Sequence, residues 1–321
     1  GSGLLPEAVF AAYCPGFPGE DLSRLEQAFS ARKLSPARYN DSRRMILAEA
    51  PDVLVVDNLF CDHAAVTAYA MERNIHVFCE KPLALTLEDC EMLEKLSHRS
   101  SSVLWAMQTF RYDPWLYTAK ALTEQGCVGE IRMVNCQKSY QLGKRPPFFG
   151  DRELYGGTIP WVAIHSIDAI AYLCGENFIS VYAQQSSDSN MGNGSMEMNA
   201  VCLFRLGNGV LAHVNADFFR PAGAPTHGDA RVRIVGTKGI LEVIRDSVYL
   251  TDDRNDGNEP VALLKPPVMF ADFLRAASGR GPGQISTESS IFSTRAALLA
   301  RESADRGEIV SFSDEKGHPV L

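Results

Sequence analysis

The sequence lacks the marks of several protein classes. It has no apolar run near the ~20 residues that a membrane helix needs and no signal-like opening, so we expect a soluble, cytoplasmic protein with no membrane partner. It has no long run of basic residues, and its formal net charge is −8, which argues against a nucleic-acid partner. The 8 cysteines include no Cys-x-x-Cys pair, so we expect reduced thiols, without a disulfide scaffold or a metal site.

What the sequence has is the composition of an ordinary globular protein. Its 321 residues are 45% hydrophobic and 22% charged, which excludes disorder, collagen and coiled coil. A single hydrophobic core rarely extends beyond ~250–300 residues, so we expect two domains.

The first part of the chain, residues 1–108, alternates short apolar runs with helical patterns. Strands are expected at 8–14, 53–58, 76–80 and 103–108, and helices at 22–31, 64–73 and 87–97. This alternation predicts parallel strands joined by crossover helices. The run at 53–56 is apolar throughout, as in a strand covered on both faces. We therefore expect an α/β fold that begins with a doubly wound parallel sheet.

The pattern changes from residue 109 onward. Strands are expected at 131–140, 179–185, 197–206, 210–218, 230–235, 240–244 and 248–250, and helices at 114–125, 159–174, 269–278 and 286–306. Glycine-bearing tight turns at 207–209 and 236–239 join neighbouring strands, which should therefore be antiparallel. Residues 109–321 are predicted to form an α+β domain with an open, largely antiparallel sheet.

One predicted strand ends in residues of contrasting chemistry, Glu80, Lys81 and Pro82. The carboxyl edge of a parallel sheet is where open α/β folds bind ligands, so these residues form a candidate site. The alternative is a solvated lysine before a helix, and spacing alone does not separate the two.

The helix expected at 159–174 carries a second set of polar residues. On a regular helix Trp161, His165 and Asp168 share one face at i, i+4 and i+7. A histidine on a mostly apolar helix is commonly a core residue. However, the Gly-Gly pair directly before this helix lets a ligand or another backbone approach closely, so a functional histidine stays open.

Four motifs along the chain belong together. They are Glu-Lys-Pro at 80–82, Phe-Arg-Tyr-Asp-Pro at 110–114, Gly-Gly…His-x-x-Asp at 156–168 and Val-Gly-Thr-Lys-Gly at 235–239. With these motifs the sequence resembles the Gfo/Idh/MocA family of sugar and polyol oxidoreductases over nearly its whole length. The resemblance implies an incomplete Rossmann-type dinucleotide-binding domain at 1–108 and a substrate-binding and oligomerisation domain at 109–321.

The resemblance also implies a cofactor, a substrate class and roles for two residues. NAD or NADP and a small carbohydrate-like molecule would lie between the domains, with Lys81 holding both and His165 acting as general acid/base. The candidate cofactor contacts are Asn58, His63, Glu80, Lys81 and Pro82. A homodimer or homotetramer is expected, because exposed strands of the second sheet associate in this family.

The expected chemistry needs such residues. Oxidation of a secondary alcohol removes a hydroxyl proton as hydride leaves the carbon, so a base with a pKa near neutrality must reach that oxygen. A nearby ammonium stabilises the developing alkoxide. The candidate substrate contacts are Arg111, Tyr140, Lys144, Arg145, Tyr155, Trp161 and Asp168. For each of them, an ordinary surface or core position is the alternative.

The beginning of the chain departs from the family pattern. It opens at residues 1–3 as Gly-Ser-Gly and enters directly what aligns as the second strand, without the first strand and its Gly-rich turn. In the usual strand order 3-2-1-4-5-6 that strand is central, so its loss predicts two unpaired edges. We expect a fragment of a longer protein, with a rebuilt N-terminal half as the alternative. Residues 1–3 are either a cloning remnant or the rest of a Gly-rich loop.

Two single positions depart as well. Pro15-Gly16 follows the first predicted strand, where the family often has an Asp for the adenosine ribose, so NAD and NADP are not distinguished. Trp161 stands where an Asp commonly precedes the helix histidine by four residues, and it is either a sugar platform or a core residue. Without that carboxylate the pKa of His165 should be lower than usual, unless Asp168 reaches it.

The main hypothesis is therefore an NAD(P)-dependent oxidoreductase of a sugar, polyol or related cyclic alcohol. The missing Gly-rich turn keeps open a non-catalytic binding or regulatory subunit on the same scaffold. A redox-assisted lyase or glycosidase is a third alternative. Saturable binding of NADH or NADPH separates the first hypothesis from the second.

Overall fold

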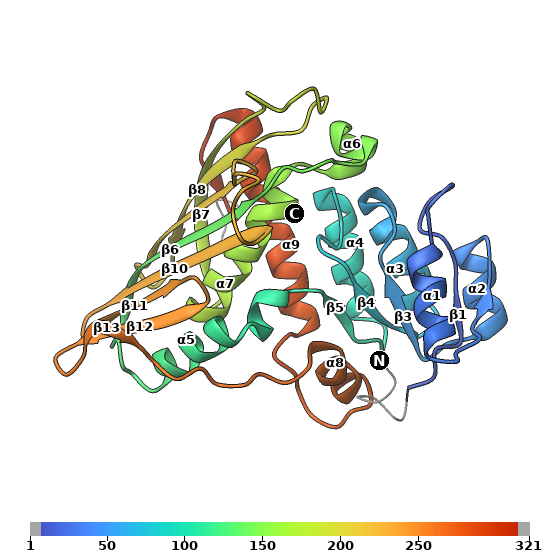
Figure 1. Cartoon of the computed structure of the whole chain (residues 1–321), viewed down its shortest axis with the longest axis horizontal. Helices are drawn as coiled ribbons and strands as arrows, with labels where there is room; N and C mark the ends of the chain where they lie inside the picture. Colours follow the sequence, from blue (N-terminus) through green and yellow to red (C-terminus); the bar gives the residue numbers. More distant parts are fainter. Residues whose placement is uncertain (1–7, 314–321) are drawn as a thin grey trace.

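The computed structural model describes residues 8–313, which form two layers side by side (Figure 1). The strands of the N-terminal layer are β1 (Ala12–Tyr13), β2 (Ala37–Arg38), β3 (Val53–Val56), β4 (His76–Cys79) and β5 (Leu104–Ala106). Its helices are α1 (Ser23–Ala31), α2 (Ser42–Glu49), α3 (His63–Met71) and α4 (Leu87–Ser97). All strand pairs in this layer are parallel, which confirms the predicted α/β arrangement.

The parallel sheet of this layer is split in two. Strand β1 pairs with β2, while β3, β4 and β5 form a separate sheet in that order. Within residues 8–313, no strand bridges β1 and β3. The two unpaired edges predicted from the missing central strand are therefore confirmed. Residues 1–3 lie outside the described residues.

The structure also corrects the start of the chain. The strand expected at 8–14 is reduced to Ala12–Tyr13, because its partner β2 offers two residues for pairing and the ladder ends there. Strand β2 and helix α2 are not predicted by the sequence pattern. Helix α2 begins after Asp41, whose carboxylate accepts a hydrogen bond from the backbone N–H of Arg44 at 2.7 Å, an N-cap that the sequence could have signalled.

The C-terminal layer is built on one nine-stranded sheet of order β13-β12-β11-β10-β6-β9-β8-β7-β14. Its strands are β6 (Ile131–Tyr140), β7 (Phe178–Ser186), β8 (Asn199–Leu206), β9 (Leu211–Asp217), β10 (Gly228–Gly236), β11 (Gly239–Ile244), β12 (Ser247–Asp252), β13 (Asp256–Pro260) and β14 (Val310–Ser311). Neighbouring strands are antiparallel except β6 and β9. The predicted open, largely antiparallel sheet is confirmed, with β13 and β14 added at its edges.

Helices cover the face of this sheet that looks toward the N-terminal layer, and the other face is bare (Figure 1). The helices that follow α4 are α5 (Pro114–Glu124), α6 (Arg152–Tyr155), α7 (Ile164–Cys174), α8 (Met269–Ala277) and α9 (Thr287–Arg306). Side chains alternate along the strands: on β8, Cys202 and Phe204 are buried, whereas Val201 and Leu203 are exposed. The second core therefore lies between the sheet and helices α7 and α9.

Helix α9 also closes the N-terminal layer. The hydroxyl of Thr287 accepts a hydrogen bond from the backbone N–H of Leu104 at 3.1 Å. The hydroxyl of Ser290 accepts one from the backbone N–H of Ala106 at 3.0 Å. Both bonds lie on β5, whose other edge pairs with β4. On the same layer, Phe273 of α8 packs on the aromatic side chains of β4 and β5. The last helices of the chain therefore complete its first layer.

Candidate active site

Polar residues follow three neighbouring strands of the N-terminal layer, at the point where each strand ends. Asn58 follows β3, Glu80 and Lys81 follow β4, and Gln108 follows β5. Because the strands are parallel and in register, these ends lie at one edge of the sheet. In open α/β folds this edge is the ligand-binding edge.

His63 holds two of these strand ends together. Its imidazole is fully buried, with Nδ1 2.7 Å from the Pro82 carbonyl oxygen and Nε2 3.2 Å from the Asn58 carbonyl oxygen. Burial lowers the pKa of His63, whereas the two carbonyl oxygens raise it because each favours a protonated ring nitrogen. The structure thus gives His63 the task of fixing the turns after β3 and β4, and its contact with a cofactor stays a prediction.

Lys81 is buried, with only 3% of its surface exposed, which excludes the solvated lysine. Its Nζ donates a hydrogen bond to the Trp161 carbonyl oxygen at 2.7 Å and lies 3.6 Å from Oε1 of Glu80. Burial lowers the pKa of Lys81 to about 7, against the opposing pull of Glu80. The amino group of Lys81 is therefore poised between its charged and neutral forms near neutral pH.

The indole of Trp161 is covered on both faces. The ammonium of Lys81 lies 3.0 Å from the centroid of the ring, and the ring of Phe60 stacks on it with centroids 4.6 Å apart. A stacked ring and an ammonium cannot share one face, so neither face is free for a sugar. Between the two interpretations of Trp161, the structure favours packing, and it adds a cation–π contact that holds Lys81.

The helix that carries His165 is present, but its beginning is not a regular α-helix. Residues Ile159–Ala163 form a π-helical turn, in which the backbone N–H of Ile164 bonds to the carbonyl of Ile159, and α7 follows. The helix expected at 159–174 is therefore irregular where Trp161 lies, whereas His165 and Asp168 are three residues apart on the regular helix α7. The indole of Trp161 meets Lys81, the imidazole of His165 meets Phe110, and Asp168 meets an arginine.

The imidazole of His165 is buried and has an unused nitrogen. It stacks on the ring of Phe110, with centroids 5.0 Å apart and planes inclined by 25°. Among the described residues, its buried Nδ1 has no hydrogen-bond partner. Burial lowers the pKa of His165 well below its ordinary value, and the charges of Lys81 and Lys138 lower it further. The ring is therefore neutral and able to accept a proton.

Arg111 and Asp168, both predicted as substrate contacts, form a buried ion pair. Nη2 of Arg111 lies 2.6 Å from Oδ1 of Asp168, and Nε lies 2.9 Å from Oδ2. Ser293 donates a further bond to Oδ1 at 2.8 Å, and Nη1 of Arg111 donates to the Gln284 carbonyl. None of these bonds involves His165. The structure gives this pair a structural role, because its charges are already satisfied by each other.

Two further predicted substrate contacts lie apart from this set. Tyr155 is fully buried, its hydroxyl is 3.1 Å from Oγ1 of Thr158, and its ring packs on Phe149. Lys144 is exposed and has no hydrogen bond or ion pair within residues 8–313. A direct substrate contact by Tyr155 is therefore corrected to a core role, because both its ring and its hydroxyl face protein.

The remaining predicted contacts line the sheet side of the site. Tyr140 lies near the end of β6 and stacks on His227, with centroids 5.1 Å apart. The guanidinium of Arg145 lies 4.7 Å from the ring centroid of Phe218. Nε of Arg145 is buried without a partner among the described residues. These two side chains stay candidates for substrate contact.

Sequence reasoning missed two residues of this set, Lys138 and Gln108. The Nζ of Lys138 lies 4.6 Å from the ring centroid of Phe110, the ring on which His165 stacks. Alternation along β6 places Lys138 on the same face as buried Cys136, and that inward position was the available signal. Gln108 is 1% exposed and ends a parallel strand, a position that could have been marked by the rule used for Lys81.

Comparison with known proteins identifies two family domains in the chain. Residues 16–108 match the oxidoreductase family NAD-binding Rossmann fold, and residues 116–242 match the GFO/IDH/MocA C-terminal domain. A solved structure from Thermotoga maritima, assigned to the oxidoreductases without a stated substrate, is 46% identical, with a TM-score of 0.93 over 97% of this chain and 95% of that one. The chain belongs to the Gfo/Idh/MocA family.

Two further proteins are less similar in sequence than that structure. Myo-inositol 2-dehydrogenase of Thermotoga maritima is 25% identical over 223 residues, which are 68% of this chain and 65% of the relative. The chain thus matches just under two thirds of that enzyme. A levoglucosan dehydrogenase in complex with NADH has 19% identity and a TM-score of 0.78, with 94% of this chain and 90% of that one covered. At that identity the likeness shows the fold alone.

The strand ends suit the nicotinamide cofactor that a Gfo/Idh/MocA protein implies. Oδ1 of Asn58 and both amide atoms of Gln108 are buried, and within the described residues they have no hydrogen-bond partner. Buried polar atoms are normally paired, and amides can pair with a carboxamide or with ribose hydroxyls. The donor set at this edge therefore fits the group.

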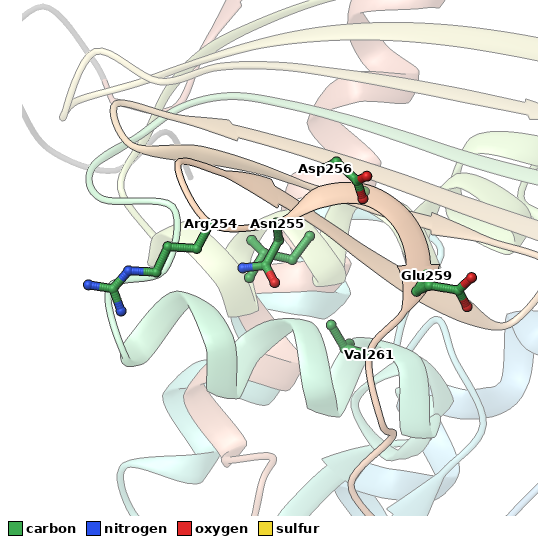
Figure 2. A pocket seen from close by; sticks show the side chains of 7 residues that line it. Arg254, Asn255, Asp256, Glu259 and Val261 are labelled. Carbon is green, nitrogen blue, oxygen red and sulfur yellow. The ribbon is translucent and has the colours of Figure 1, made fainter.

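A hollow elsewhere in this Gfo/Idh/MocA chain has a different character. Figure 2 shows it under the turn between β12 and β13, where Asn255 and Val261 lie above a helix. None of the residues around Lys81 and His165 lines this hollow. Within residues 8–313 no cluster of side chains suits a metal ion, and no helix has the length and apolar character needed to cross a membrane.

Proposed function

We propose that this chain is a nicotinamide-dependent dehydrogenase of a sugar, polyol or related cyclic alcohol, with His165 as the base and Lys81 as the group that holds the reacting oxygen. The observation that carries the proposal is a buried, neutral imidazole with an unused nitrogen beside a buried ammonium. Both groups lie where the two layers meet. The named relatives, an inositol dehydrogenase and a levoglucosan dehydrogenase, support the substrate class.

His165 is suited to take the hydroxyl proton of the substrate. Its ring is uncharged at neutral pH, and the stacked Phe110 restricts its orientation. A positioned base of this kind contributes about 10²–10⁴-fold to turnover. The cofactor, when bound, supplies the acceptor for the hydride.

Lys81 is suited to orient the substrate oxygen and to stabilise its negative charge. An ammonium has three N–H donors. The Trp161 carbonyl takes one donor, Glu80 faces a second at 3.6 Å, and the indole of Trp161 faces the ammonium at 3.0 Å, so a substrate oxygen would take the place of Glu80. Because the site is buried, this hydrogen bond is stronger than the same bond in water.

For the cofactor, we propose NAD held by Asn58, Glu80, Lys81, Pro82 and Gln108. The unpartnered amides of Asn58 and Gln108 support this assignment, as does the NADH bound to the levoglucosan dehydrogenase. Use of NADP is the alternative, since Pro15-Gly16 at the end of β1 replaces the acidic residue that would contact a ribose. The split parallel sheet favours, as a second candidate, a binding subunit without catalysis.

One experiment tests the function and separates these candidates. The chain is titrated with NADH and with NADPH by fluorescence, and a panel of sugars and inositols is followed by nicotinamide absorbance. We expect saturable NADH binding and turnover of at least one polyol or sugar. Absence of saturable binding to either nucleotide would contradict the dehydrogenase. Binding without turnover of any alcohol would favour the binding subunit.

We also propose that the chain forms a homodimer or homotetramer through the bare face of its large sheet. Exposed apolar side chains gather there on neighbouring strands: Leu203 is 52% exposed on β8 and Leu211 is 57% exposed on β9. Contiguous exposed apolar surface of this kind marks an interaction site. Sedimentation equilibrium should give a multiple of the chain mass, and Leu203→Glu should lower it. A single-chain mass for the unaltered protein would contradict the proposal.

A further inference from the structure

A lysine occupies a position of the large sheet where a core residue is expected. Along β6, Val134 and Cys136 face the helices and are buried, and Lys138 and Tyr140 continue that row toward the site. The Nζ of Lys138 lies between two aromatic rings, 4.6 Å from the centroid of Phe110 and 4.9 Å from that of Tyr140. Its ammonium therefore points into the region where His165 and Lys81 meet.

Lys138 has no carboxylate in direct contact, although Asp113, and less strongly Asp246 and Asp229, favour its charged form from a distance. Within residues 8–313, no carboxylate lies within ion-pair distance of it, and no hydrogen bond is made by its Nζ. Aromatic faces return only about 0.5–2 kcal/mol to a cation, whereas an unpaired charge in a partly buried site is costly. Burial accordingly lowers the pKa of Lys138. A bound anion would form an ion pair with such an ammonium.

The residues that flank Lys138 on the sheet are small. Its direct neighbours on the two adjacent strands are Ala216 on β9 and Ala230 on β10. The neighbour of Tyr140 on β10 is Gly228, and the space over that glycine is taken by the ring of Tyr140 and the Nζ of Lys138. Directly opposite side chains in a sheet share one face, so no long side chain of a neighbouring strand covers the ammonium.

Other charges around the site do not neutralise Lys138. The carboxylate of Asp229 is held by Arg231 at 3.0 Å and by Gln137 at 3.1 Å, and Asp246 lies exposed in the turn between β11 and β12. Asp113 lies beyond ion-pair distance, and burial raises its pKa to about 6. Two further cations face the same region, Lys81 and Arg145.

We infer that the substrate is an anionic sugar or cyclic polyol, a sugar acid, whose carboxylate pairs with Lys138 while a neighbouring hydroxyl is presented to His165. The inference rests on the proposed function for the hydroxyl, but the binding of the acid does not depend on turnover. A phosphate ester presents the same charge chemistry from another source. Neutral sugars leave the ammonium of Lys138 unpaired.

Pairs of ligands that differ at one carbon provide the test. D-Glucuronate and D-glucose, and D-galacturonate and D-galactose, are titrated into the chain with and without NADH by calorimetry, and their turnover is compared. Glucose 6-phosphate is the arm that distinguishes phosphate from carboxylate. We expect at least one acid to bind about tenfold or more tightly than its neutral partner, which corresponds to about 1.4 kcal/mol.

Variants then assign the preference to one side chain. Lys138→Met, which keeps the length of the side chain without its charge, should reduce the ratio of acid to neutral affinity to within about twofold, and Lys138→Arg should restore part of it. Lys265→Met removes an exposed lysine outside the site and should leave the ratio unchanged.

Each outcome decides the inference separately from the proposed function. Equal affinity for acid and neutral ligands, or an acid preference that survives in Lys138→Met, overturns it even if the chain oxidises neutral polyols. Preference for the phosphate ester that is lost in Lys138→Met supports the anion site and assigns its ligand to the phosphates. Acid-selective binding without any oxidation supports the anion site and contradicts the dehydrogenase.

Discussion

Helix α7 carries two polar side chains three residues apart, and their surroundings are opposite. Asp168 is bonded to Arg111 through both oxygens and to Ser293, so its charge is matched and its acceptors are used. His165 faces an aromatic ring and two ammonium groups, and its Nδ1 has no partner in the described part of the chain. One helix thus carries a carboxylate whose charge and acceptors are paired and an imidazole whose Nδ1 is unpaired among the described residues.

The difference separates structure from chemistry within a single element. A fully paired polar cluster has nothing left for a ligand, and its loss should be felt as instability. A cluster with unpaired polar groups lowers the stability of the folded protein, and a bound molecule can supply the missing partners. The predictions below test this division, beginning with the largest effect.

The largest effect is expected on turnover, from substitution of His165. His165→Ala should lower turnover by about 10²–10⁴-fold, because the proton acceptor is lost. Any fall in melting temperature should come from the lost packing on Phe110, since no hydrogen bond of the Nδ1 atom is removed. Steady-state kinetics and thermal melts on the same preparation measure both. Near-normal turnover in this variant would exclude His165 from the mechanism.

Substitution within the Arg111–Asp168 pair should lower the stability of the protein. Asp168→Ala leaves the buried guanidinium of Arg111 without its counter-charge, so the free energy of unfolding should fall by about 3–5 kcal/mol. The double variant Arg111→Met with Asp168→Leu removes both charges and should be less destabilised than the single variant. Denaturant titrations give both values. Equal losses in the two variants would show that the pair is not the source of the effect.

Lys81→Met should change both turnover and the pH dependence of stability. Turnover should be lost, because the group that holds the reacting oxygen is removed. The pKa of Lys81 is about 7 in the folded chain and near 10.5 when unfolded, so the unfolded chain binds more protons between these values. Stability of the unaltered protein should therefore gain from rising pH across this window, and Lys81→Met should lack that gain. Denaturant titrations across the window measure the gain, and a variant that keeps it would contradict this account.

The smallest effect concerns the electrostatics of His165. The charge of Lys138 lowers the pKa of His165, so Lys138→Met should move that pKa upward. Alcohol oxidation needs the neutral ring and is lost as the pH falls through this pKa, so the acidic limb of the kcat/KM profile should shift to higher pH. Lys265→Met, an exposed control outside the site, should leave the limb in place. An unshifted limb in Lys138→Met would mean that the two groups do not communicate.

The sequence predicts the fold class and most helices and strands well. It predicts the hydrogen-bond and ion-pair partners of polar side chains poorly. Local signals mark Lys81, at the end of a parallel strand, and His165, after a Gly-Gly pair, and the resemblance to the Gfo/Idh/MocA family implies their roles. The pairing of Arg111 with Asp168 joins segments 57 residues apart and depends on how α7 packs, which no spacing rule gives. Lys138 was missed because it sits in a strand pattern that reads as an ordinary two-sided alternation.

Local geometry explains the remaining differences. The π turn at Ile159–Ala163 replaces regular helical bonds with one that reaches five residues back, a change that leaves the apolar pattern of the helix intact. The short strands β2 and β13 carry little apolar alternation, so their existence depends on the neighbour that pairs with them.

The hydroxyl groups of α9 that bond to β5 have a consequence for synthesis of the chain. The N-terminal strands leave the ribosome before α9, so the free side of β5 stays open to solvent until residues 287–306 have emerged. During that interval the nascent chain exposes an unpaired strand edge that can pair with strands of other chains, so protection by chaperones would matter most then. A chain that lacks α9 should accordingly aggregate, and its N-terminal layer should not fold as a separate soluble unit.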